Sequence, residues 1–223
     1  TKDTALRIKG AQLALPVEDY RADTAQVDEL YSGVIEVEVG KEGIDRFFVE
    51  EKLTLPYTEA LLNQFVILRN GPSQSALGRV VQAEPDVIVS RIGSSRQMFG
   101  IEPKNLRQVF ATDLLMDPDV PAVSLMGMAG AGKTFLALAA GLEQVLEQQR
   151  YRRVAVYRPL VAVGRQEVGY LPGDLDEKLT PWMAAVHDNL HALFSDLPPD
   201  EARHLVDDLV ERGEIEMSSV TYL

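Results

Sequence analysis

The sequence predicts a mixed α/β protein in which a small β-rich module precedes an α/β layer with a parallel sheet. Apolar and acidic residues alternate over 35–39, which is the period of a strand with one face in solvent. Expected helices and strands alternate between about 104 and 158, which is typical of parallel strands joined by helices. The 223 residues, of which 46% are hydrophobic, are enough to build an ordinary globular core.

Composition and charge exclude several classes of protein. The chain has no cysteine, which excludes disulfides, thiolate metal sites and cysteine nucleophiles. Its net charge of −12 disfavours nonspecific electrostatic binding of nucleic acid over the whole protein surface. Any contact with nucleic acid would have to use a local basic patch. No apolar run approaches the length of about 18 residues that a membrane span needs, and the first residues lack a secretory signal. We therefore expect a soluble, cytoplasmic protein without membrane contact.

Three parts are expected along the chain. Residues 1–30 join a short basic opening to an acidic stretch, show few signs of a core, and are interpreted as an end piece. Residues 31–92 form the β-rich module, and residues 93–223 form the α/β domain. The change of composition around Gly93-Ser94-Ser95 is typical of a linker.

The expected elements follow from residue patterns. In the β-rich module, a turn at Asn70-Gly71 separates two apolar runs, which predicts a pair of strands, and a third short run follows. These three strands are placed at 65–68, 76–81 and 87–89. In the α/β domain the order is helix, strand, helix, strand, a long helical stretch broken at Leu197-Pro198-Pro199, and a strand. The corresponding ranges are about 104–116, 121–126, 133–149, 153–158, 174–212 and 215 onward.

One loop of the α/β domain matches the phosphate-binding pattern GxxxxGK[ST] at every fixed position. Its residues are Gly127, Met128, Ala129, Gly130, Ala131, Gly132, Lys133 and Thr134. An apolar stretch enters the loop and an Ala- and Leu-rich helix former leaves it, which is the order that a Walker A loop requires. Glycines let consecutive backbone N–H groups face a polyphosphate, and the helix start adds its positive dipole end.

Two side chains of this loop carry the expected chemistry. Lys133 would reach the β- and γ-phosphates, and the hydroxyl of Thr134 would bind Mg²⁺. We therefore predict Lys133 and Thr134 as catalytic residues and Thr134 as a metal ligand. The pattern by itself leads no further than binding of a nucleoside triphosphate.

Hydrolysis also needs an acidic residue that holds the Mg²⁺ shell at the end of a second apolar strand. The nearest candidate within 150–223, Leu205-Val206-Asp207-Asp208, lies in a helical and charged segment. Only 91 residues follow Gly132, fewer than an open parallel sheet of about four to six strands needs. We therefore expect an incomplete sheet and a chain that lacks its Walker B acid.

Several stretches together resemble the PhoH-like ATPase family. They lie between Leu106 and Leu193 and include NLRQVFATDLLMD, the Walker A loop with its helix, and VYRPLVAVGRQEVGYLPGDLDEKLTPWM, while the tail from Gly213 to Leu223 is similar to the segment before that family's Walker B strand. The resemblance implies a P-loop NTPase core that binds ATP and Mg²⁺. It further implies hydrolysis coupled to unwinding or degradation of single-stranded RNA, by a ring of identical subunits in which a neighbour's arginine could complete the site.

The first nine residues resemble the last conserved segment of a PIN-domain ribonuclease. In that family an aspartate at the position of Asp3 helps to hold catalytic metal. The resemblance implies a PIN–PhoH fusion protein in which residues 1–30 are the C-terminal remnant of the PIN-like domain. A lone aspartate cannot hold a two-metal site, so Asp3 is not expected to be catalytic in this chain.

The resemblance also suggests roles for residues outside the loop. Gln108 lies where this family and related superfamily-one helicases place an adenine-reading glutamine, whose amide can donate to and accept from the purine edge; an ordinary exposed helix residue is the alternative. Arg158 and Arg165 lie where such helicases contact single-stranded nucleic acid, and a solvated loop is the alternative. Both belong to a basic cluster that consists of Arg150, Arg152, Arg153, Arg158 and Arg165.

Two other classes of function stay open. A small-molecule kinase uses the same phosphate loop but needs an acceptor pocket and a lid, for which the sequence gives no separate signal. A non-catalytic nucleotide switch or assembly module would need no acidic strand. Turnover stimulated by RNA, turnover stimulated by one metabolite, or binding without turnover would distinguish the three.

Overall fold

The computed structural model describes residues 8–10, 12–13, 15, 33–56, 59–93, 98–158 and 175–219. The chain divides into two compact units, Thr1–Arg91 and Ile92–Leu223, which are described separately. Asp3, Arg165 and most of the linker lie outside the described residues, as does the side chain of Arg158. The predicted separation of residues 1–30 from the β-rich module stays a prediction.

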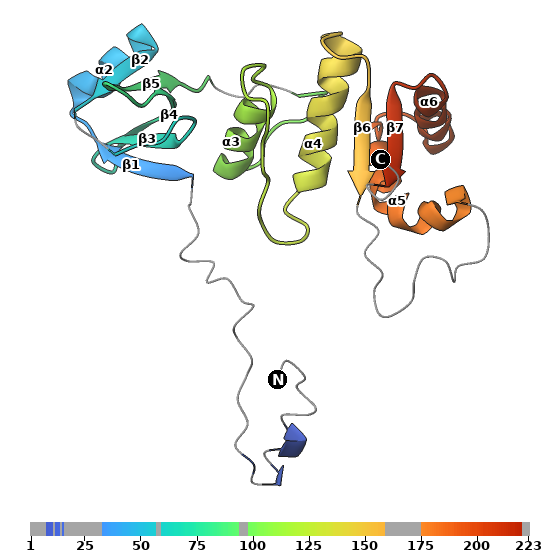
Figure 1. Ribbon diagram of the computed structural model, residues 1–223. Coiled ribbons are helices and arrows are strands. Elements are labelled where there is room, and N and C mark those ends of the chain that lie inside the picture. The colour runs from blue at the N-terminus through green and yellow to red at the C-terminus, as the bar shows by residue number, and fades with distance from the viewer. Residues whose placement is uncertain are drawn as a thin grey trace. The chain divides into compact units, whose positions relative to one another are not determined.

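Unit 1 is built on a five-stranded sheet with the order β1-β3-β4-β5-β2 (Figure 1). Strand β1 pairs with β3 in parallel, and the other neighbours are antiparallel. The predicted strands around Asn70-Gly71 are confirmed as β3 and β4, and Gly71 turns the chain between them with φ 59°. The elements are β1 (Val34–Glu38), α2 (Lys41–Glu50), β2 (Lys52–Leu55), β3 (Phe65–Asn70), β4 (Gln74–Gln82) and β5 (Val87–Arg91).

Helix α2 was not predicted from the sequence. Only Ile44 and Phe47 are buried over its ten residues, so its apolar stripe is short. The helix packs against β2, β3 and β4, where Phe47 joins a core that includes Val66, Leu68 and Val89. The i, i+3 spacing of its two buried residues was the available signal.

An ion pair links the two parallel strands of unit 1 on their outer face. The Nε and Nη2 atoms of Arg69 donate to the two carboxylate oxygens of Glu36 at 2.6 Å and 3.2 Å. These hydrogen bonds lower the pKa of the Glu36 carboxyl from its ordinary value. Because both side chains are exposed, the ion pair adds little to the free energy of unfolding. Its main effect is to favour the observed register between β1 and β3.

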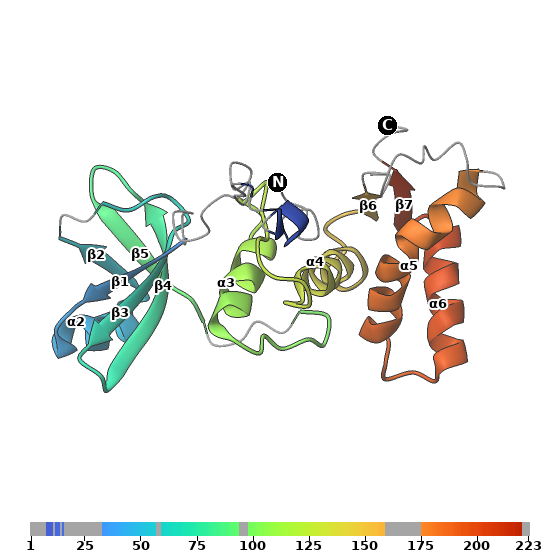
Figure 2. The ribbon, with the colours of Figure 1, turned by 90° about the horizontal axis from the view of Figure 1, so that it is seen from below.

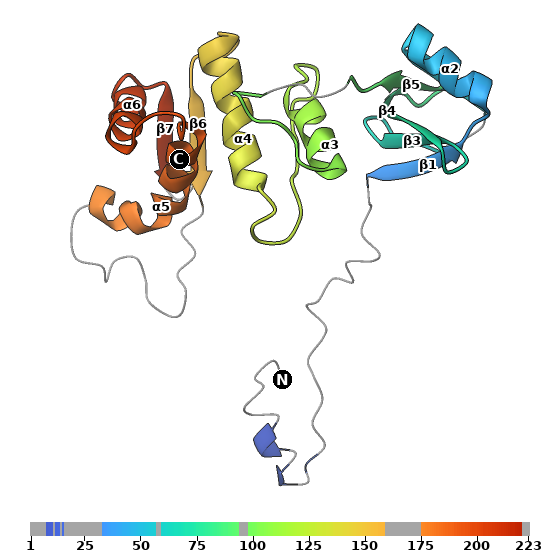
Figure 3. The same cartoon turned by 180° about the vertical axis from the view of Figure 1, so that it is seen from behind.

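Unit 2 combines helices with a two-stranded parallel sheet. Strands β6 and β7 pair from Val154 opposite Ile215 to Arg158 opposite Ser219. Helix α4 lies between α3 and β6 (Figures 1 and 3), and α5 and α6 lie side by side next to β7 (Figure 2). The elements are α3 (Leu106–Leu115), α4 (Lys133–Leu142), the π-helical turn η2 (Glu143–Glu147), β6 (Val154–Arg158), α5 (Leu175–Leu193), α6 (Pro199–Glu211) and β7 (Ile215–Ser219).

Most predicted elements of unit 2 are confirmed, but the predicted strand at 121–126 is wrong. The segment is partly exposed and forms no strand, because no strand in the described part of the chain pairs with it. The parallel sheet is therefore limited to β6 and β7 among the described residues, and the larger sheet, in unit 1, is mostly antiparallel. The break at Leu197-Pro198-Pro199 separates α5 from α6, with Pro199 in the first turn of α6.

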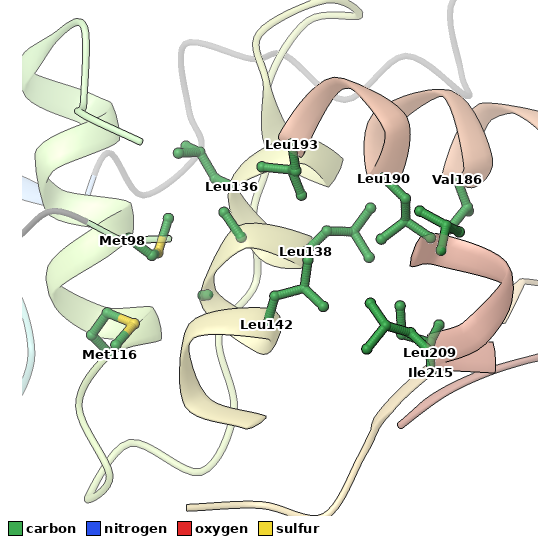
Figure 4. Close-up of a cluster of buried hydrophobic side chains, with 13 residues drawn as sticks. Met98, Met116, Leu136, Leu138, Leu142, Val186, Leu190, Leu193, Leu209 and Ile215 are labelled. Carbon is green, nitrogen blue, oxygen red and sulfur yellow. The ribbon is translucent and has the colours of Figure 1, made fainter. Parts of the chain in front are cut away.

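The core of unit 2 forms where α4 meets α5, α6 and β7. Leu138 and Leu142 of α4 lie toward Leu190, Leu209 and Ile215 (Figure 4), and each of these side chains is at most 4% exposed. The packing fixes both ends of α4 and so the position of the loop that precedes it. Among the helices that the structure describes, none combines the length and apolar character needed to cross a membrane.

Candidate functional site

The loop before α4 adopts the backbone that its glycines predict. Gly130 has φ 77°, and Gly132 is the N-cap of α4 with φ 82° and ψ 13°. Both angles lie in the left-handed region, which favours glycine because a Cβ would clash with the backbone. The backbone conformation of the loop therefore favours glycine at positions 130 and 132.

The first turn of α4 exposes backbone donors. Leu136 is the first helical residue whose N–H bonds back into the helix start, to Gly132 O at 2.9 Å. Within the described ranges, the N–H groups of Gly132, Lys133 and Thr134 donate to no acceptor, and no side chain caps the helix. No acidic residue lies in this turn. Unpartnered N–H groups at the positive end of a helix dipole form a binding surface for an anion.

Lys133 folds back over the loop. Its Nζ donates to Gly127 O at 2.9 Å and to Met128 O at 2.7 Å. An ammonium group has three donors, so one remains after these two contacts. The lysine thus holds the loop closed on itself and can exchange the two carbonyls for phosphate oxygens.

Thr134 occupies the second position of α4 and is exposed. Its hydroxyl lies one residue beyond the lysine, beside the unpartnered N–H groups. A hydroxyl at this place can serve as an oxygen ligand of a hard cation such as Mg²⁺. The structure therefore brings the predicted catalytic and metal-binding residues together at one helix end.

Gln108 of α3 reaches the loop, although it precedes Gly127 by 19 residues. Its Nε2 donates to Ala131 O at 3.4 Å and lies 3.4 Å from where a Cβ on Gly132 would be. Its Oε1 accepts from the N–H of Lys104 at 2.7 Å. The structure thus places Gln108 at the predicted site, and adenine reading stays a prediction.

One positioning residue was missed by the sequence analysis. Asn105 is the N-cap of α3, and its Oδ1 accepts from the N–H of Gln108 at 3.0 Å. This contact fixes the first turn of α3 and so the base of the Gln108 side chain. The signal was an asparagine directly before a run of helix formers, which is a common helix start.

The structure describes only part of the predicted basic cluster, because Arg165 and the side chain of Arg158 lie outside the described residues. Arg152 and Arg153 precede β6, whereas Arg158 is its last residue. Arg158 lies five positions after Arg153, which corresponds to about 16 Å along the strand backbone. A nucleic-acid role for Arg158 and Arg165 stays a prediction.

Comparison with known proteins gives the same family over most of unit 2. Residues 100–223 match the family model described as PhoH-like protein. A protein named PhoH2 from Thermobispora bispora is 37% identical over 223 residues, which is all of this chain and 49% of that protein. The PhoH2 proteins of Mycolicibacterium smegmatis and Bacillus subtilis are 38% and 35% identical, again over the whole of this chain, and 48% and 51% of their lengths are covered. No solved structure matches.

The chain spans about half the length of the curated relatives it matches. The family model covers more than half of the chain, and the matched residues include the loop, Gln108 and all the elements of unit 2. From the family match and these relatives, the chain belongs to the PhoH-like protein family.

Proposed function

We propose that the chain is the ATP-binding, Mg²⁺-dependent P-loop NTPase module of a PhoH-like protein. One observation carries the proposal: among the described residues, the N-terminus of α4 presents unpartnered N–H groups beside a lysine whose Nζ donates to two loop carbonyls. A triphosphate supplies acceptors for all of these donors at once. The two glycines in the left-handed region leave no Cβ between the loop and such a ligand.

The residues present fit the two expected ligands. Lys133 and the backbone of 130–134 would hold the β- and γ-phosphates, and Thr134 would contribute an oxygen to Mg²⁺. Bound Mg²⁺ neutralises charge on the phosphates. The amide of Gln108, beside the loop, offers the donor and acceptor that a purine edge requires.

The wider part of the proposal concerns the whole protein. We propose that it couples ATP hydrolysis to unwinding or degradation of single-stranded RNA in the cytoplasm, as a ring of identical subunits. The family resemblance supports the RNA part, and the similarity of residues 1–9 to a PIN-domain segment supports a fused ribonuclease. Neither of the parallel strands that the structure describes, β6 and β7, ends in an acidic residue that could hold the Mg²⁺ shell, so for this chain the proposal is limited to ATP binding.

A calorimetric titration with MgATP tests the binding step. Lys133→Ala should abolish binding, because Lys133 is the cationic residue of the loop sequence 127–134, and the fold should persist because the lysine is not in the core. Lys41→Ala is a matched control, since Lys41 also begins a helix directly after a glycine, in unit 1. Equal MgATP affinity of the two variants would exclude the loop as the site.

Phosphate release with and without single-stranded RNA tests the wider proposal. The assay compares this chain with the full-length PhoH2 protein of Bacillus subtilis. RNA-stimulated turnover by the longer protein and ATP binding by this chain support the proposal. Turnover that does not respond to RNA would remove the RNA part and leave the nucleotide site intact.

A further inference from the structure

A cavity lined by arginines lies at the amino-terminal ends of β6 and β7. Its volume is about 320 Å³, and its lining residues are Arg152, Arg153, Arg212 and Gly213. The first two residues directly precede the first residue of β6, and the other two lie shortly before β7. Because β6 and β7 run in parallel with Val154 opposite Ile215, the strand register brings together residues that are 60 positions apart in the sequence.

This cavity is separate from the phosphate loop. Helix α4 starts at the loop and runs opposite to β6, and a Cβ on Gly141 would lie 3.0 Å from Cγ2 of Val154. From Lys133 to Glu147 the helical rise amounts to about 20 Å. The arrows of β6 and β7 in Figure 1 point away from the cavity end of the sheet. The cavity therefore lies at the opposite end of α4 from the nucleotide loop.

The guanidinium groups that line the cavity keep free donors. Nη1 of Arg153 lies 3.1 Å from Glu216, and Nη2 of Arg212 lies 3.0 Å from Glu214. Each of these ion pairs uses one nitrogen of a group that has five N–H donors. Arg152 forms no ion pair with any residue in the described part of the chain. The carboxylates thus orient two of the arginines without saturating them.

Capping of the C-terminal end of α6 does not account for the side chain of Arg212. Basic residues at helix C-termini often compensate the exposed carbonyls of the last turn. At the end of α6, the N–H of Gly213 donates to Val210 O at 3.0 Å and the N–H of Glu214 donates to Leu209 O at 2.9 Å. These two backbone bonds and the φ of 71° at Gly213 form a complete Schellman cap. The helix end is therefore satisfied without the guanidinium.

We propose that this cavity is a second anion site, which binds phosphate groups of a phosphate-bearing ligand. Planar guanidinium groups match phosphate oxygens in pairs, and three arginines line this cavity, which has the size of small-ligand sites. Two of the three arginines are paired with Glu216 and Glu214, so an anion would be selected by the charge of Arg152 and by the N–H donors that the paired guanidinium groups retain. The ligand is either a small polyphosphate or the backbone of a nucleic acid, which share this chemistry. The site does not depend on the nucleotide function of the loop.

The test is a calorimetric titration of the full chain with inorganic pyrophosphate at low salt. We expect the double variant Arg152→Gln, Arg212→Gln to weaken pyrophosphate binding at this site by about tenfold for each arginine removed. Arg203→Gln is the matched control, because Arg203 is an exposed arginine of α6 outside the cavity. MgATP affinity should be unchanged in the double variant, whereas Lys133→Ala should lose MgATP and keep the cavity site. Failure of one site is thereby distinguished from failure of the other.

A second double variant, with lysine in place of both arginines, controls for an effect of the glutamine substitutions on folding. Arg152→Lys, Arg212→Lys keeps the charge but loses the paired geometry, so its pyrophosphate affinity should fall between the wild-type and glutamine values. Fluorescence anisotropy with a labelled single-stranded oligouridylate separates the two sources of phosphate. Weakening of both probes assigns a nucleic-acid backbone, and weakening of pyrophosphate alone assigns a small anion. Affinities of both double variants within twofold of Arg203→Gln would overturn the proposal.

Discussion

At the scale of single residues, Gln108 has an amide that contacts the loop and keeps capacity for a ligand. Its Oε1 accepts from the N–H of Lys104, and its Nε2 donates to Ala131 O at 3.4 Å. An amide group has two N–H donors and two acceptor lone pairs, so one donor and one acceptor remain after these two contacts. A purine edge can use this remaining pair while the contact to the loop persists.

We expect Gln108→Ala to lose the preference for ATP over GTP while both nucleotides still bind. The reason is that alanine removes the side chain of α3 that donates to the loop and that can distinguish the two purines. Competition between ATP and GTP in a binding titration measures the change. Gln148→Ala, an exposed glutamine beyond the other end of α4, serves as the control. An unchanged preference in Gln108→Ala would show that the amide supports the loop and does not read the base.

The candidate site illustrates which residues a sequence pattern can identify. The loop was predicted because each of its positions obeys a local rule: glycine for the left-handed backbone, lysine for the phosphates and a hydroxyl for Mg²⁺. The grouping of Arg212 with Arg152 depends on the register of two distant strands, which no local pattern encodes. The local sequence pattern therefore predicted the phosphate-binding loop but could not predict the arginine-lined cavity.

At the scale of elements, the sheet of unit 1 depends on a glycine where no side chain fits. A Cβ on Gly78 of β4 would lie 2.3 Å from Cγ1 of Val89, 3.0 Å from Cζ of Phe47 and 3.1 Å from Ser90 O. Val89 and Phe47 are fully buried, so neither can move without loss of packing. The close approach of β5 and α2 to β4 therefore requires glycine at this position.

We expect Gly78→Ala to lower the free energy of unfolding of unit 1 by about 1–3 kcal/mol, because an overpacked core must shift its backbone or side chains. Denaturant unfolding followed by circular dichroism measures the loss. Gly40→Ala is the control, since Gly40 lies in unit 1 and a Cβ there meets no atom within 4 Å. Combined with Val89→Ala, which removes the clashing methyl, the two costs should be less than additive. Full additivity would contradict the packing argument.

The elements that were predicted correctly are marked by signals in the local sequence. Strands β3 and β4 flank a turn dipeptide, and α4 follows a loop of fixed pattern. The strand at 121–126 was predicted from an apolar run alone, but a strand also needs a hydrogen-bonded neighbour, and the described residues supply none. Helix α2 was missed because two buried residues make too short a stripe to stand out among alternating strands.

At the scale of the whole molecule, the chain contains two separate cores. One cluster of buried side chains belongs to unit 1 and another to unit 2, and within the described residues they share no member. A ligand that binds only one folded unit stabilises that unit, by an amount set by its concentration relative to its Kd. The nucleotide loop lies entirely within unit 2, so the effect of a bound nucleotide should be confined to that unit.

Hydrogen exchange with and without MgATP measures this confinement directly. At a ligand concentration of 100 times Kd, unit 2 gains about 2.7 kcal/mol, so its most protected amides, in α4 and β6, should exchange about 100-fold more slowly. Amides of β3 and β4 in unit 1 should keep their rates, and Lys133→Ala should remove the protection in unit 2. Equal slowing in both units would instead mean that they unfold as one. A nucleotide bound at the loop could then control the stability of the β-rich unit as well.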